Sequence, residues 1–148
     1  MENILVRQMN INDIDLVCDI EVKSFSTPWS KNAFVDEIES NKLSDYLVVE
    51  YQGKVVGYGG MWLILDEAHI TNIAIHPNFR GKGLGNYIVE GIINRCREKN
   101  ILKITLEVRE SNHTAIALYK KYGFEECGKR LGYYSDTNED AIIMWKNF

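Results

Sequence analysis

The chain has few of the residues that mark secreted or metal-binding proteins. Only three of its 148 residues are cysteine, and only two are proline. Cys18, Cys96 and Cys127 are odd in number and far apart, which indicates reduced thiols rather than a disulfide framework or a zinc site. The three histidines also lack metal-ligand spacing. We therefore expect no metal site and a cytoplasmic location.

Long apolar runs and an excess of positive charge are also missing. No stretch of 18 apolar residues predicts a membrane span, and residues 1–4 lack the basic and apolar regions of a signal peptide. The net charge of −4 argues against a general nucleic-acid binder. The length predicts one domain over residues 1–148, and nothing in the sequence sets an oligomeric state.

The most informative segment that is present is a glycine-rich run over residues 76–86. Three glycines alternate there with a cation and an apolar residue, after an arginine. A strand-like segment (70–75) leads into the run and a helix-like segment (84–96) leaves it. Glycines let a backbone approach a ligand closely, and helix N-termini favour phosphate. The run therefore predicts a phosphate-bearing cofactor.

Two common phosphate-binding loops do not fit this run. A Walker loop needs Ser or Thr after its lysine, but Gly83 follows Lys82. A dinucleotide fingerprint needs a third glycine where Asn86 stands.

Apolar periodicity along the chain alternates between strand and helix patterns, which predicts a mixed α/β fold. A first helix, capped by Asn10 or Asn12, should reach Phe25, and Ser30 should cap a second helix. The remaining expected helices span 84–96 and 112–122. The expected strands span 4–7, 46–51, 54–65 (a hairpin turning at 52–53), 70–75, 103–109, 124–129 and 141–145.

The strand before the glycine run has an irregular face. Ile73 and Ile75 share one face by period two, whereas Ile70 falls on the other. A β-bulge near Thr71 and Asn72 would restore the phase, bend the strand away from its neighbour and leave backbone groups free for an extended amide ligand. The alternative is a central strand buried on both faces, which needs no phase.

These residues match a family pattern. Arg80-x-x-Gly83-x-Gly85 after a strand resembles the acetyl-CoA signature of the GNAT N-acetyltransferases. Further motifs, over nearly the whole chain, resemble the RimI-like ribosomal-protein alanine N-acetyltransferases of this family. They include Pro28-Trp29-Ser30, Asn72-Ile73-Ala74, Leu106-Glu107-Val108-Arg109, Gly123-Phe124, Tyr133-Tyr134 and Glu139-Asp140-Ala141.

The resemblance implies a single GNAT domain of the α/β (α+β) class. Its bent, mixed, mostly antiparallel sheet would have about six to seven strands, helices on both faces, and acetyl-CoA between splayed central strands. The implied cofactor-binding residues are Ile73, Ala74, Ile75, Arg80, Gly81, Lys82, Gly83, Leu84, Gly85, Asn86 and Asn112. Arg80 and Lys82 could equally be ordinary surface cations, and Asn112 could also cap a helix.

Glu107 and Tyr119 are the catalytic candidates. Glu107 lies on the polar face of an otherwise apolar strand, where a carboxylate is well placed to act as a general base. Its alternative role is an ion pair with Arg109. The resemblance places the Tyr119 hydroxyl near the cofactor sulfur as a general acid; helical spacing alone would make it a core aromatic.

The resemblance also implies an acceptor groove. Its aromatic borders would be Trp29, Tyr133 and Tyr134, which could instead be satellite core. Nearby acidic residues, Asp136, Glu139 and Asp140, could attract a basic peptide or form a solvated turn. The implied reaction acetylates the N-terminal α-amine of a protein, with the N-terminal alanine of a small-subunit ribosomal protein as acceptor. Lysine side chains or small amines as acceptors, and a non-catalytic acetyl-CoA-binding module, stay open.

Overall fold

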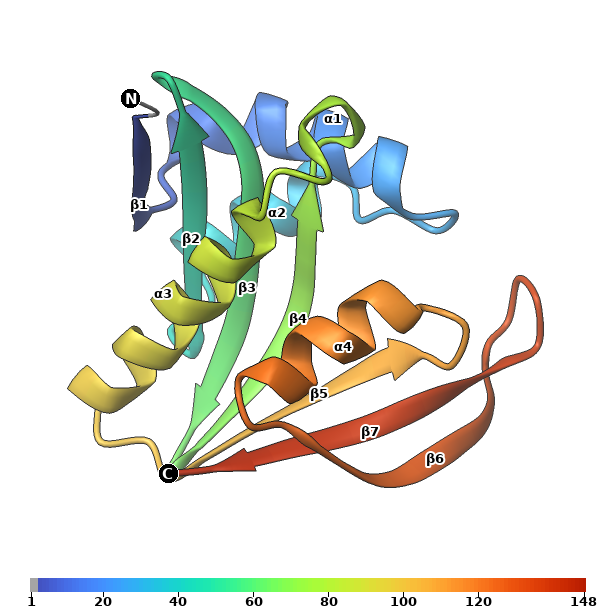
Figure 1. The fold of residues 1–148 in the computed structure, drawn as a ribbon. Helices are drawn as coiled ribbons and strands as arrows, with labels where there is room; N and C mark the ends of the chain where they lie inside the picture. Colours follow the sequence, from blue (N-terminus) through green and yellow to red (C-terminus); the bar gives the residue numbers. More distant parts are fainter. Residues whose placement is uncertain (1–2) are drawn as a thin grey trace.

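The fold is built on one seven-stranded sheet, shown in Figure 1. The computed structural model describes residues 3–148. The strands are β1 (Ile4–Gln8), β2 (Ser44–Tyr51), β3 (Lys54–Ile64), β4 (Glu67–Ile75), β5 (Lys103–Arg109), β6 (Glu125–Tyr134) and β7 (Glu139–Asn147). Their order is β1-β2-β3-β4-β5-β7-β6, and β4–β5 is the parallel pair in an otherwise antiparallel sheet within the described residues. The predicted mixed, mostly antiparallel sheet is confirmed.

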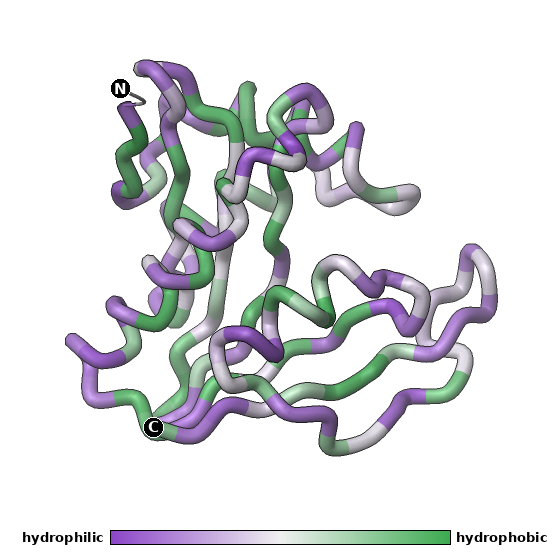
Figure 2. Tube along the Cα trace, viewed as in Figure 1, coloured by the Kyte–Doolittle hydropathy of each residue, from purple (hydrophilic) through white to green (hydrophobic). Residues whose placement is uncertain are grey.

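Helices cover both faces of the sheet, as expected. They are η1 (Ile11–Asp13), α1 (Ile14–Ser24), α2 (Lys31–Glu39), η2 (Pro77–Phe79), α3 (Leu84–Glu98) and α4 (His113–Lys121). One hydrophobic core joins α1 and α2 to the sheet, and a second joins α3 and α4 to the opposite face. Along α3, hydrophilic and hydrophobic stretches alternate in Figure 2, because one side of the helix is buried and the other is not. None of the helices in residues 3–148 is long and apolar enough to cross a membrane.

The predicted boundaries differ from the structure mainly at the ends of the elements. The Asn10 side chain accepts a hydrogen bond from Asn12 N at the start of η1, which continues into α1. Phe25 lies just beyond α1 in an extended conformation, so the first helix ends one residue earlier than expected. Strands β6 and β7 are longer than predicted, because their pairing with each other continues outward to Tyr134 and Glu139.

The strand before the glycine run contains the predicted bulge. In the β3–β4 ladder Gly60 faces Asn72 but Met61 faces Ile70, so Thr71 is the extra residue. As a result Ile70 packs against the same core as Ile73. The bulge is confirmed.

Strands β4 and β5 separate soon after they meet. Within the described residues they pair only from Glu67–His69 to Lys103–Thr105. Beyond that point the two strands diverge in Figure 1, with α4 in front of β5 and the β6–β7 hairpin extending past its end. The separation leaves the β5-facing backbone edge of residues 70–75 outside the ladder.

Candidate active site

A cavity of about 690 Å³ opens where β4 and β5 separate. Its walls come from the loop after α1, from β4 and β5, from α4 and from the end of β6. Seven residues predicted to belong to the site line it: Trp29, Ile73, Glu107, Asn112, Tyr119, Tyr133 and Tyr134. The fold thus brings both catalytic candidates and all three acceptor-groove candidates to one space.

Glu107 reaches the cavity from β5. Its Oε2 lies 3.1 Å from Arg130 Nε on β6 in an ion pair, and accepts no hydrogen bond from residues 3–148. Burial and the nearby Glu107 carboxylate raise the pKa of Tyr133. The alternative ion pair with Arg109 is wrong, because Arg109 instead pairs with Asp136 in the β6–β7 loop and with Glu139 at the start of β7.

Tyr119 reaches the same cavity from α4. Its side chain is buried, with the ring centroid 5.8 Å from that of Phe124. Burial raises the pKa of its hydroxyl above the ordinary value, so the group is protonated at neutral pH. Tyr119 is therefore a core aromatic that also lines the cavity.

Asn112 performs the structural role expected of it. Its side-chain oxygen accepts a hydrogen bond from Ala115 N at 3.2 Å, which caps α4. The cap fixes the start of the helix that carries Tyr119.

The aromatic border of the cavity is held by charged groups. Tyr133 and Tyr134 meet edge to face at 5.1 Å, and the Arg109 guanidinium lies 4.1 Å from the Tyr134 ring centroid. On the opposite side, the backbone N–H of Trp29 donates to Glu21 Oε2 at 2.8 Å.

Glu21 was not predicted from the sequence. It is 2% exposed, and Tyr58 donates a hydrogen bond to its other carboxylate oxygen. The available signal was its spacing from Ile14 and Val17, which places a carboxylate on the buried face of α1.

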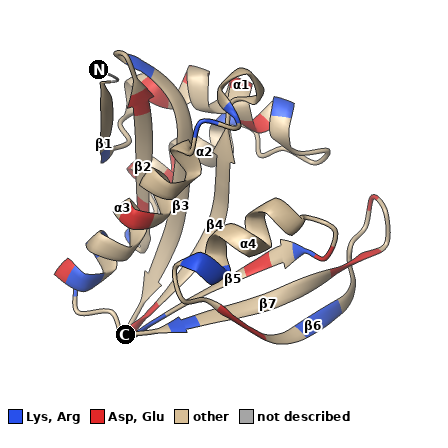
Figure 3. Ribbon diagram, in the orientation of Figure 1, with Lys and Arg blue, Asp and Glu red and all other residues tan. Residues whose placement is uncertain are grey.

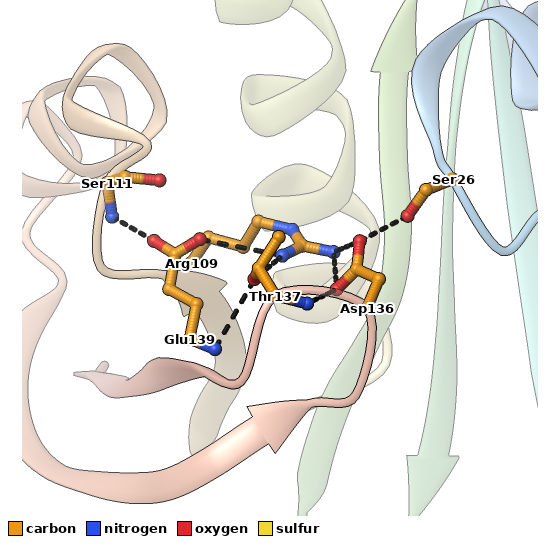
Figure 4. Close-up of polar contacts among 6 residues, drawn as sticks. All are labelled: Ser26, Arg109, Ser111, Asp136, Thr137 and Glu139. Atoms are coloured by element: carbon orange, nitrogen blue, oxygen red, sulfur yellow. Dashed lines mark hydrogen bonds and ion pairs between the residues drawn. The ribbon is translucent and has the colours of Figure 1, made fainter.

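Arg109 ties the β6–β7 loop to the end of β5, as Figure 4 shows. It donates two hydrogen bonds to Asp136, at 2.8 and 3.0 Å, and one to Thr137 at 3.2 Å. Ser26, in the loop after α1, donates to the same carboxylate. The hydrogen bonds from Ser26 and Arg109 lower the pKa of Asp136 below its ordinary range. The loops on the two sides of the cavity therefore meet across it.

The other acidic residues of this segment also have internal partners. Glu139 lies 3.5 Å from Arg109 and accepts a hydrogen bond from Ser111 N at 2.6 Å. Asp140 accepts from Gly132 N at 2.9 Å. These contacts give the acidic turn a structural role that neither of the sequence-based interpretations included.

The glycine run lies at the other end of β4, beside the N-terminus of α3. Gly81 and Gly83 have φ values of 81° and 76°, which favour glycine. Within residues 3–148 no side chain caps the N-terminus of α3, which begins after Gly83. Figure 3 shows Lys and Arg residues in this loop. Two open glycines, nearby cations and a helix N-terminus that no described side chain caps form a cradle that suits phosphate, and the Asn86 N–H there donates to Gly83 O at 3.2 Å.

The two cations of the run have different surroundings. Arg80 donates from Nε to Ile75 O at 2.9 Å and from Nη2 to Ser24 at 3.0 Å, so it braces the loop. Lys82 Nζ lies 5.8 Å from the ring centroid of Tyr51.

Asn86 connects the same helix end to α4. It donates from Nδ2 to Gly83 O at 3.1 Å, and its Oδ1 accepts from Lys121 and Tyr122. The remaining predicted cofactor residues, Ala74, Ile75, Leu84 and Gly85, lie at the end of β4 and the start of α3.

The chain is similar to known acetyltransferases. Residues 14–124 match the acetyltransferase (GNAT) family. The ribosomal protein bS18-alanine N-acetyltransferase of Escherichia coli (strain K12) is 35% identical, with 94% of each chain covered. A Bacillus subtilis (strain 168) protein, to which that activity is provisionally assigned, is 47% identical over 95% of this chain and 93% of its own. The crystal structure of the ribosomal-protein-S18-alanine N-acetyltransferase from Escherichia coli superposes with a TM-score of 0.90 at 31% identity, covering 98% of this chain and 94% of that one.

These similarities confirm the family resemblance found in the sequence and extend over nearly the whole chain. The protein is an acyltransferase of the kind that takes its acetyl group from acetyl-CoA. The chain belongs to the GNAT family of N-acetyltransferases.

Proposed function

We propose that this protein transfers the acetyl group of acetyl-CoA to the N-terminal α-amine of a protein, with the N-terminal alanine of ribosomal protein bS18 as its acceptor. The names of its relatives support the acceptor. The observation that carries the proposal is the single cavity between β4 and β5, where Glu107 and Tyr119 face the same space. A carboxylate can take a proton from the attacking amine, and a protonated hydroxyl can supply one to the leaving sulfur.

The chain's own backbone supplies the proposed cofactor site. Beyond His69, the edge of β4 that faces β5 pairs with no described strand. Residues 73–75 on this edge would pair with the amides of the pantetheine arm. The N–H groups of residues 81–86 would hold the pyrophosphate, with the charge offset by Lys82 and by the helix dipole of α3. Acetyl-CoA bound there supplies an acetyl thioester, and Asn112 would contact it from the start of α4.

Glu107 would accept a proton from the acceptor amine, directly or through water. The residue lines the cavity, while its Oε2 is buried and lies 3.1 Å from Arg130 Nε. Tyr119 would donate its proton to the departing sulfur, since burial keeps the hydroxyl protonated. A CoA thiol has a pKa near that of cysteine, about 8.5, so CoA leaves as the neutral thiol at pH 7 once it has received this proton.

An α-amine demands less of this base than a lysine does. An α-amine has a pKa of about 8 and lysine about 10.4, a difference worth about 3.3 kcal/mol at neutral pH. Glu107 forms an ion pair with Arg130, so its carboxylate already has a positively charged partner. An α-amine, which is already partly neutral in solution, is therefore a better acceptor for this base than a lysine is. Trp29, Tyr133 and Tyr134 would border the acceptor peptide.

Mass spectrometry with two peptides tests the proposal. One peptide carries a free N-terminal alanine and no lysine, and the other is blocked at its N-terminus and carries an internal lysine. We expect a single acetyl mass shift on the first peptide only. A shift on the second alone would identify a lysine acetyltransferase. No shift on either would favour a small-amine acceptor or a non-catalytic module, which a panel of free amines would separate.

A further inference from the structure

Asn72 lies in the wall of the cavity and has a buried hydrogen-bond donor without a partner among the described residues. It lies on β4 directly after the bulge, lines the cavity and is 8% exposed. Its Nδ2 has no hydrogen-bond partner among residues 3–148. Buried donors are paired in the great majority of cases, so this one calls for a ligand atom.

The side chain is held with its nitrogen free. Thr71 Oγ1 donates to Asn72 Oδ1 at 2.7 Å, and the Tyr46 hydroxyl lies 3.0 Å from the same Thr71 oxygen. With Tyr46 donating to Thr71, and Thr71 donating to Asn72, each hydroxyl proton in this chain is used. The carboxamide oxygen is therefore occupied, and its NH₂ group is left to donate elsewhere.

The backbone makes this arrangement possible. The bulge lets the consecutive side chains of Thr71 and Asn72 reach one another on the side of Tyr46. Gly60, opposite Asn72, leaves room for the Tyr46 ring, since a Cβ there would lie 2.1 Å from it.

A neutral carbonyl oxygen is the best partner for this donor. The carboxylates that line the cavity have other partners: Glu21 accepts from Tyr58 and Trp29, and Asp136 accepts from Ser26 and Arg109. Glu107 forms an ion pair with Arg130. In a peptide, the α-carbon that carries the terminal amine also carries a carbonyl. A lysine side chain or an alkylamine has a methylene at that place. Because Asn72 and Glu107 line the same cavity, a donor on Asn72 could distinguish these acceptors.

We infer that Asn72 determines acceptor specificity by donating a hydrogen bond from Nδ2 to the carbonyl oxygen of the first acceptor residue. The inference rests on the proposed N-terminal acetyltransferase function. It gives the cavity a means of selecting peptide N-termini over other amines.

A substrate–variant cycle tests the inference. The parent peptide begins with alanine, and its partner has the first peptide bond replaced by an uncharged trans-alkene, which removes the carbonyl. Asn72→Asp keeps the side-chain shape and the oxygen that Thr71 binds but replaces the NH₂ donor. For the wild type we expect kcat/KM to fall about 10- to 100-fold from the parent peptide to the alkene. With the parent peptide, kcat/KM of Asn72→Asp should be lower than that of the wild type by a similar factor. Within Asn72→Asp, kcat/KM should then differ little between the parent peptide and the alkene.

Equal fractional losses for the two peptides in Asn72→Asp would overturn the inference, because a merely structural role affects both substrates alike. Undiminished activity of Asn72→Asp would also overturn the inference, because that variant has no NH₂ group at this position to donate to the substrate carbonyl. Asn94→Asp, on the exposed side of α3, is the matched control and should leave both rates unchanged. If the wild type does not acetylate the parent peptide, the proposed function fails and this inference fails with it. If the wild type acetylates that peptide but Asn72→Asp loses the same fraction of kcat/KM with both peptides, only the inference is refuted.

Discussion

Replacing Gly83 with alanine should weaken cofactor binding far more than it weakens the fold. Gly83 has a φ of 76°, and an added Cβ would meet no atom closer than Asn86 Nδ2 at 3.7 Å. The cost to folding is therefore mainly that of a left-handed conformation, about 1–2 kcal/mol. For a domain of this size that cost lowers the melting temperature by about 2–8 °C.

Gly53 provides a matched control in the β2–β3 turn. Its φ is 82°, and no described atom lies within 4 Å of an added Cβ. Gly53→Ala should therefore cost about as much stability as Gly83→Ala, at a position that belongs neither to the cavity nor to the glycine run. Only at Gly83 would the added methyl group also stand where the proposed pyrophosphate approaches the start of α3. Loss of one or two charge-assisted hydrogen bonds to phosphate predicts CoA binding weaker by about 10- to 100-fold.

Isothermal titration with CoA, alongside thermal unfolding of both variants, measures the two effects separately. The phosphate-cradle account predicts equal falls in melting temperature and a loss of CoA affinity in Gly83→Ala alone. Equal CoA affinity in the two variants would refute the assignment of this loop to the pyrophosphate.

The other predictions concern the cavity. Glu107→Gln should lower kcat/KM by about 10²- to 10⁴-fold with CoA affinity unchanged, whereas Glu125→Gln at the exposed start of β6 should not; wild-type turnover in Glu107→Gln would remove the base. Tyr119→Phe keeps the ring packing, so activity should fall while the melting temperature stays within a few degrees; full activity would exclude the acid role. The α-amine of an alanine peptide loses its proton near pH 8, so kcat/KM should rise up to about that pH. Because burial raises the pKa of Tyr119, kcat/KM should not fall before about pH 10, and an alkaline fall below pH 10 would contradict the acid role. Arg109→Lys keeps the charge but loses the planar fork that holds the β6–β7 loop, so KM for the peptide should rise more than kcat falls; an unchanged KM would refute the positioning role.

Local patterns in the sequence predicted most of the elements of the fold and the bulge in β4. The range of β5 agrees with its alternating pattern, and the bulge followed from the phase of the isoleucines in β4. Both features depend on periodicity within one segment, which a sequence displays directly.

Long-range pairing could not be predicted in the same way. β7 inserts between β5 and β6, and alternation in a strand identifies its faces but not its neighbours. Arg109 binds Asp136, and Glu107 binds Arg130, only because the β6–β7 hairpin folds back along β5. The nearer Glu107–Arg109 pair was therefore the wrong choice.

The site is spread over parts of the chain in a similar manner. The donor of Asn72 is oriented by Tyr46, which lies on another strand and reaches Thr71 only because of Gly60. Periodicity marked the bulge, but the hydroxyl chain that orients the side chain becomes visible only when the strands are paired.

The most direct test of the central claim uses one peptide with two amines. The peptide carries a free N-terminal alanine and an internal lysine, and tandem mass spectrometry locates the acetyl group after incubation with acetyl-CoA. The account predicts acetylation of the α-amine, with the lysine unmodified at early time points. Acetylation of the lysine in preference to the α-amine would contradict it.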